Sequence, residues 1–96
     1  MPLSALVMDA KDNVATALCN LENGDSVKLE IGDSAVNVVL LQPIPFGHKL
    51  ALKDIEQGEA IIKYGETIGQ ATVKIGKGEH VHVHNVEGLK GRGDKP

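Results

Sequence analysis

Aromatic side chains are almost absent from this sequence of 96 residues, in which Phe46 and Tyr64 are the only two. A hydrophobic core therefore has to be built from Val, Ile, Leu and Ala, and such a core favours a compact unit rich in β-structure. The length allows one domain at most. A chain of this size can bury a modest core, but it is small for an independent enzyme with an enclosed active site.

Disulfide bonds and long apolar runs are also excluded. Cys19 is the single cysteine, so no internal disulfide can form, and this is compatible with the reducing cytoplasm in which we expect the protein. No apolar run approaches the roughly 20 residues of a membrane span. The short run Leu3 to Met8 lacks the basic flank of a signal peptide. We expect no membrane contact.

A strong excess of one sign of charge is also missing. The net charge is −3, with acidic and basic residues interspersed along the chain. This pattern provides neither a basic face for nucleic acid nor a polybasic stretch for an anionic membrane surface. We expect neither as a partner.

Apolar residues from Asp25 onward repeat with the period of β-strands. Alternation over 27–31, a turn at 32–34 and a return over 35–41 predict a hairpin, and 60–64 with 67–73 predict a second one. Glycine recurs before the apolar runs, which is typical of tight turns and bent strands. These patterns predict a mainly β fold of short, strongly curved strands.

One segment has the spacing of an amphipathic helix instead. Its apolar residues fall at i, i+3, i+4 and i+7: Val14, Ala17, Leu18 and Leu21. This spacing predicts one short helix near Asp12 to Leu21. Asp12 is suited to cap its start, and Asn23-Gly24 to end it.

Three of the four histidines lie close together in the segment 78–85. If this segment is a strand, its side chains alternate between two faces. His80, His82 and His84 then share one face. Val81 and Val83 share the other face and are expected to pack into the core.

Strand geometry limits how these histidines can bind a metal. Alternate side chains originate about 6.6 Å apart, so His80 and His84 start about 13 Å apart. His82 can therefore converge on one divalent ion with either of them, whereas all three would need a bent strand. We predict His80, His82 and His84 as metal ligands and His82 also as a catalytic residue. The alternative is a solvent-facing polar row on an edge strand.

Two further pairs of residues are candidates for the site. His48 and Lys49 follow Gly47, and an imidazole beside an ammonium suits a carboxylate or a developing oxyanion. We predict both as catalytic residues, with a hydrogen bond from His48 to backbone as the alternative. Lys63 and Tyr64 are predicted to bind substrate. Their alternatives are plain surface for Lys63 and a core position for Tyr64, with its hydroxyl at the rim.

Three segments in this order, 44–52, 62–69 and 78–85, carry a family resemblance. They resemble the N-terminal region of the altronate and galactarate dehydratase family, a SAF domain with the β-clip fold. The resemblance covers roughly Asp12 to Asn85. In that family the region precedes a much larger catalytic region or is a separate small subunit. The chain is also similar to the alpha subunit of sulfolactate sulfo-lyase.

The resemblance implies a SAF domain over residues 1–88, and the glycine- and charge-rich tail 89–96 is expected to be flexible. It implies the small subunit of a lyase that dehydrates a sugar acid, with a divalent metal, iron in this family, shared with a large catalytic subunit. Asn85 and Arg92 join Lys63 and Tyr64 as predicted substrate-binding residues.

Dehydration of a sugar acid needs a base, an acid and a cation that stabilises the enediolate. This chain alone is too small to supply them all, so we expect it to be inactive without its partner and to self-associate when isolated. Two alternatives remain open. One is the alpha subunit of a carbon–sulfur lyase acting on sulfolactate, and the other is a non-enzymatic module that binds carbohydrate or a partner protein.

Overall fold

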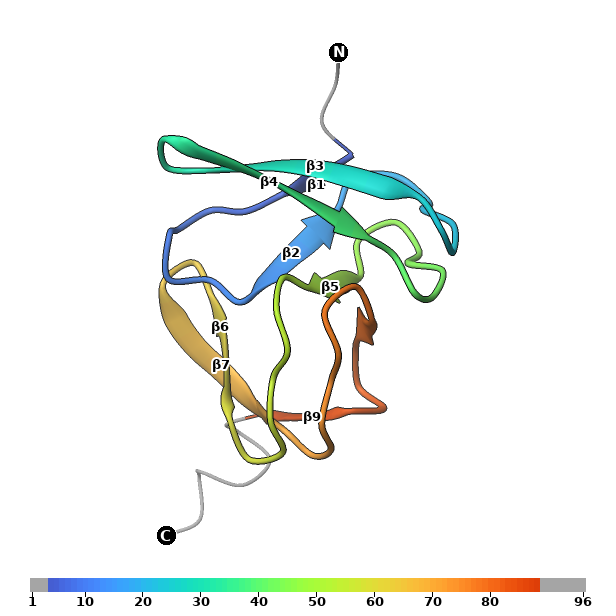
Figure 1. The fold of residues 1–96 in the computed structure, drawn as a ribbon. Coiled ribbons are helices and arrows are strands. Elements are labelled where there is room, and N and C mark those ends of the chain that lie inside the picture. The colour runs from blue at the N-terminus through green and yellow to red at the C-terminus, as the bar shows by residue number, and fades with distance from the viewer. Residues whose placement is uncertain (1–3, 89–96) are drawn as a thin grey trace, which may run out of the picture.

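The computed structural model describes residues 4–88, and within that range all regular secondary structure is β-strand. The strands are short and are shown in Figure 1. Their bounds are β1 (Ala5–Leu6), β2 (Val14–Ala17), β3 (Ser26–Ile31), β4 (Ser34–Val39), β5 (Lys49–Ala51), β6 (Ala60–Lys63), β7 (Glu66–Ala71), β8 (His80–Val81) and β9 (Val86–Gly88). The predicted mainly β fold and both predicted hairpins, now β3–β4 and β6–β7, are confirmed.

The strands form three small antiparallel sheets. A four-stranded sheet has the order β1-β2-β5-β8, a hairpin is made of β3 and β4, and a three-stranded sheet has the order β6-β7-β9. In Figure 1 the β3–β4 hairpin lies above the four-stranded sheet and the β6–β7 hairpin lies below it. The four-stranded sheet is therefore the central element of the fold.

Two apolar clusters pack on the two faces of this central sheet. Val14 and Ala15 are neighbours on β2, yet Ala15 belongs to the cluster with the β3–β4 hairpin and Val14 to the cluster with the β6–β7 hairpin. Leu50 and Ala51 on β5 divide in the same way. This division follows from the alternation of side chains along a strand.

The helix expected near Asp12 to Leu21 is wrong, because Val14–Ala17 is strand β2. Three of the four residues of β2 are buried, and it pairs with β1 on one side and β5 on the other. A central strand covered on both faces has apolar residues without a period of two. The apolar spacing therefore matched a helical pattern by coincidence, and Leu18 of the expected stripe is 41% exposed.

Asp12 has a different structural role from the expected helix cap. Its buried carboxylate accepts hydrogen bonds from the backbone N–H groups of Met8, Asp9 and Gly65, at 3.3, 3.2 and 2.8 Å. These bonds tie the loop before β2 to the turn between β6 and β7. Asp12 therefore connects two parts of the chain that are distant in sequence.

Both aromatic residues lie outside the core. Phe46 is 66% exposed and Tyr64 is 56% exposed, so the alternative of a core position for Tyr64 is wrong. The buried hydrophobic residues are Val, Ile, Leu and Ala, as the composition predicted.

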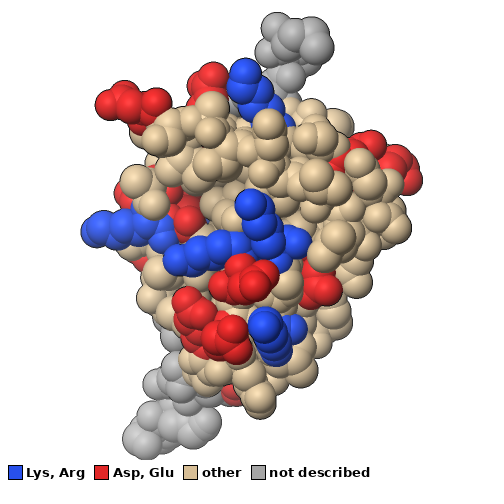
Figure 2. All heavy atoms as spheres, in the orientation of Figure 1, with Lys and Arg blue, Asp and Glu red and all other residues tan. Residues whose placement is uncertain are grey.

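Charged groups of both signs share the surface. Figure 2 shows basic side chains in a band across the middle of one face, with acidic side chains beside and below them. Within residues 4–88 no helix is long and apolar enough to cross a membrane.

Candidate functional site

The histidine-rich segment is a short strand followed by a turn rather than one continuous strand. Strand β8 ends at Val81, and residues 82–85 form a turn closed by a 3.1 Å hydrogen bond from the N–H of Asn85 to the carbonyl of His82. The expectation of one straight strand through His84 is therefore wrong, and the ring centroids of His80 and His84 lie 5.1 Å apart.

The two valines of this segment have opposite environments. Val81 is fully buried in the cluster under the β6–β7 hairpin, as expected. Val83 lies in the turn and is 81% exposed, so its expected place in the core is wrong. A side chain in a turn no longer follows the alternation of the strand before it.

Asn85 holds this turn in place. Its buried side chain donates a 2.8 Å hydrogen bond from Nδ2 to the carbonyl of His80 and accepts a 3.0 Å bond at Oδ1 from the N–H of His82. Both ends of the amide are therefore bound to the backbone of the two histidine residues, which fixes the turn that follows β8.

The fourth histidine completes a group with two of the other three. Strands β5 and β8 are neighbours, which brings His48, just before β5, to the start of β8. His48 Nδ1 and His80 Nε2 form a 2.8 Å hydrogen bond, and the rings of His48 and His82 stack at 3.8 Å between centroids. We call His48, His80 and His82 the histidine group.

The position of His48 follows from a turn that occurs four times within the described residues 4–88. In each turn the fourth N–H donates to the first carbonyl, the third residue is a glycine with φ between +85° and +92°, and a strand follows. The turns are 22–25, 45–48, 56–59 and 76–79. Glycine is required there because other residues rarely adopt such φ values.

In three of these turns the last residue is acidic and binds its own turn. The carboxylates of Asp25, Glu59 and Glu79 accept the N–H of the first residue at 2.9, 2.9 and 2.7 Å. The second turn begins with Pro45, which has no N–H to donate, and ends with His48. The ring of His48 is thus free to contact His80 and His82. This departure from the repeat is a signal that the sequence analysis missed.

The donor set of the histidine group suits a divalent metal. One ligand nitrogen from each of His48, His80 and His82 lies within 4.8 Å of the others. Nitrogens bound to one ion at about 2.0–2.1 Å are at most about 4.2 Å apart. The three rings are stacked nearly parallel, with interplanar angles of 12–22°, so the rings would have to rotate for their lone pairs to converge on one ion. Imidazole is a ligand for iron, zinc, copper and nickel. His84, a predicted ligand, is not a member of this group.

Electrostatics keep these rings in the form that a metal requires. Partial burial, followed by the charges of His84, His48, His82 and Lys49, lowers the pKa of His80 below its ordinary value of 6.5. Partial burial and then His48, Lys49 and His84 lower the pKa of His82 in the same way. A lowered pKa favours the neutral form of both rings, and a neutral imidazole can donate its lone pair to an ion.

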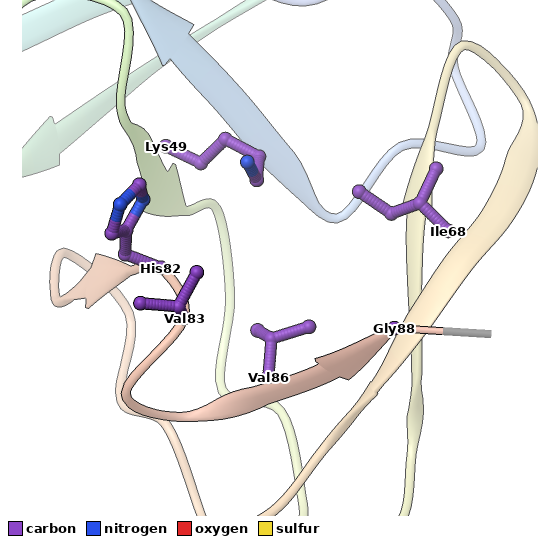
Figure 3. Close-up of a pocket in the computed structure, with 6 residues that line it drawn as sticks. All are labelled: Lys49, Ile68, His82, Val83, Val86 and Gly88. Carbon is purple, nitrogen blue, oxygen red and sulfur yellow. The ribbon is translucent and has the colours of Figure 1, made fainter. Parts of the chain in front are cut away.

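A cavity of about 240 Å³ opens beside the histidine group. Figure 3 shows Lys49 pointing from β5 into this cavity, with its ammonium nitrogen between His82 and Ile68. The other lining residues are Val83, Val86 and Gly88. Burial, and then the charge of Lys63, lowers the pKa of Lys49.

The remaining predicted site residues lie around or outside this region. Lys63 ends β6, and its Nζ lies 4.9 Å from the ring centroid of Tyr64. Tyr64 has φ +57°, and the next N–H, that of Gly65, is the one bound by Asp12. Arg92 lies outside the described residues.

Comparison with known proteins gives one consistent family. Residues 3–89 match the family described as the altronate/galactarate dehydratase SAF domain. Altronate dehydratase of Escherichia coli (strain K12) is 46% identical over 76 residues, covering 79% of this chain and 14% of that one. Altronate dehydratase of Bacillus subtilis (strain 168) is 36% identical over 88% of this chain and 16% of its own length.

A third relative has a length similar to that of this chain. The (2R)-sulfolactate sulfo-lyase subunit alpha of Chromohalobacter salexigens is 36% identical over 92 residues, which cover 91% of this chain and 96% of that subunit. The chain thus spans a small part of the two altronate dehydratases and nearly all of this subunit.

Proposed function

Because the chain belongs to the altronate/galactarate dehydratase SAF domain family, we propose that it is the small subunit of a lyase that dehydrates a sugar acid. Its histidine group holds a divalent metal, iron, at an active site shared with a larger catalytic subunit. The observation that carries the proposal is the convergence of three imidazole nitrogens within 4.8 Å beside a cavity that contains a lysine.

The proposed reaction removes the proton next to a carboxylate and expels the neighbouring hydroxyl. When bound, a divalent metal would supply Lewis acidity to this reaction. In this chain His48, His80 and His82 would hold the ion, and the Lys49 ammonium would face the substrate. The base and the acid come from the larger subunit, because the site lies at the surface of a small domain.

The surface around the site suits such a partner. Val83 lies next to His82 and is 81% exposed, and Phe46 lies two residues before His48 and is 66% exposed. Exposed apolar side chains beside a polar site are typical of protein interfaces. A larger subunit that covers them would also exclude water from the site.

A carbon–sulfur lyase is the second candidate. The match along 96% of a sulfolactate sulfo-lyase subunit alpha favours it. The same site would then stabilise the enediolate of sulfolactate while sulfite leaves in place of hydroxide. Supplying the assembled enzyme with altronate, galactarate or sulfolactate separates the two candidates.

Reconstitution with the large subunit tests the proposal. His48→Gln, His80→Gln and His82→Gln should each lower turnover by at least about 100-fold while the affinity between subunits stays within about threefold. His84→Gln is the matched control, since it removes a neighbouring histidine outside the group. If all three variants keep wild-type turnover and metal content, or if the isolated chain is fully active, the proposal is wrong. If the chain binds a partner but no tested acid is converted, the non-enzymatic module is supported.

A further inference from the structure

The cavity beside the histidine group contains Lys49, which forms no ion pair with a carboxylate within residues 4–88. We propose that Lys49 forms an anion subsite in this cavity, which takes the terminal acid group of a small hydroxy acid next to the metal. The presence of this subsite is inferred from the residues that line the cavity. The identity of its ligand rests on the proposed function.

The side chain of Lys49 is half-buried and points into the cavity, as Figure 3 shows. Within residues 4–88 the one ion pair is that of Lys74 with Glu56, at 3.7 Å, so neither Lys49 nor Lys63 has a carboxylate partner there. A buried or half-buried charge is unfavourable unless it is paired. A bound anion would supply the missing partner.

The walls of the cavity strengthen this interaction. Ile68, Val83 and Val86 contribute apolar surface to the cavity; Val83 lies beside His82, and Ile68 and Val86 lie farther from it. Apolar walls lower the local dielectric constant and thereby increase the attraction between an ammonium and an anion. Lys63 lies near enough for its charge to act on Lys49, and therefore adds to the positive potential in the cavity.

The position and size of the cavity define the class of ligand. His82 lines the cavity and also belongs to the histidine group, so an acid group at Lys49 lies directly beside the proposed metal. The volume of about 240 Å³ is below that of pockets for drug-sized ligands, and it fits an acid of a few carbons. A carboxylate and a sulfonate share the required charge and acceptor oxygens.

Malate and sulfolactate are matched probes, because they differ in having a carboxylate or a sulfonate at one end. We would titrate each into the metal-free chain at low ionic strength and follow backbone amide shifts by NMR. The triol obtained by reducing both carboxylates of malate is the uncharged control. The proposal predicts saturable shifts at residues of the cavity with both anions, and none with the triol.

Three variants assign the binding to the lysines. Lys49→Gln should weaken anion binding about tenfold and Lys63→Gln less, whereas Lys28→Gln, at an exposed position of β3, should have no effect. Tighter binding of one anion identifies whether carboxylate or sulfonate is preferred. Unchanged binding in Lys49→Gln, equal binding of the triol, or shifts confined to residues away from the cavity would overturn the proposal.

The outcome is separable from that of the proposed function. His48→Gln should lower metal affinity at least about tenfold, whereas Lys49→Gln should lower anion affinity in the metal-free chain. Anion binding without turnover in the assembled enzyme would support the proposed subsite and contradict the proposed lyase activity. Turnover that is unchanged in Lys49→Gln would support the proposed lyase activity and contradict the proposed subsite.

Discussion

His48 shows how a single residue can be identified from sequence while its contacts are not. A histidine after a glycine, beside a lysine, indicated a candidate site, but its partners depend on the pairing of β5 with β8. That pairing joins residues more than 30 positions apart, and local patterns carry no information about it. The sequence analysis therefore grouped His80 and His82 with His84, whereas the structure groups them with His48.

Asn85 is a positioning residue with a testable effect. Asn85→Ala removes the donor to the His80 carbonyl and the acceptor for the His82 N–H, which leaves two part-buried backbone groups without these partners. The free energy of unfolding should fall by about 1–3 kcal/mol and metal affinity by about tenfold. Urea unfolding and metal titration measure the two effects.

Asn85→Asp retains the acceptor for the His82 N–H, but it sets a charged carboxylate oxygen against the His80 carbonyl in place of the donor. It should therefore also lower the free energy of unfolding. Asn37→Ala, at an exposed position of β4, is the control. Wild-type metal affinity in Asn85→Ala would show that the turn does not position His82.

At the scale of elements, hairpins were predictable and the central strand was not. The alternation of apolar and polar residues over 27–31 predicted a strand with one buried face, and the structure confirms it as β3. Strand β2 is buried on both faces, so its apolar pattern had no period of two. The same limitation applies to the histidine segment, where a turn interrupts the strand after Val81.

The repeated turn leads to a prediction about the role of His48. Pro45→Gly combined with His48→Glu gives the second turn the pattern of the fourth, Gly76 to Glu79, in which the carboxylate accepts the first N–H. The free energy of unfolding of the double variant should stay within about 1 kcal/mol of the wild-type value, because the new hydrogen bond offsets the flexibility of glycine. Its metal affinity should fall at least about tenfold.

His48→Gln alone is the comparison, since it removes the imidazole without restoring the turn. Thermal or urea unfolding measures stability, and metal titration measures binding. If the double variant binds metal as tightly as wild type, His48 is not a ligand and serves only to end its turn.

At the scale of the whole molecule, composition predicted the kind of core but not its division into two. The scarcity of aromatics correctly indicated a core of aliphatic residues. The two clusters arise because the central sheet is covered on both faces, by β3–β4 and by β6–β7. The site lies at one edge of this sheet, where residues from β5, β8 and the turn after β8 meet. An edge position leaves the histidines accessible to a second subunit.

The central claim is that His48, His80 and His82 bind one divalent ion together. Anomalous diffraction from crystals loaded with iron or cobalt, recorded at the absorption edge of the metal, tests it most directly. We predict a single peak about 2.0–2.1 Å from one ring nitrogen of each of the three histidines. A peak that contacts His84 but not His48, or no peak while the His48–His80 hydrogen bond persists, would contradict the claim.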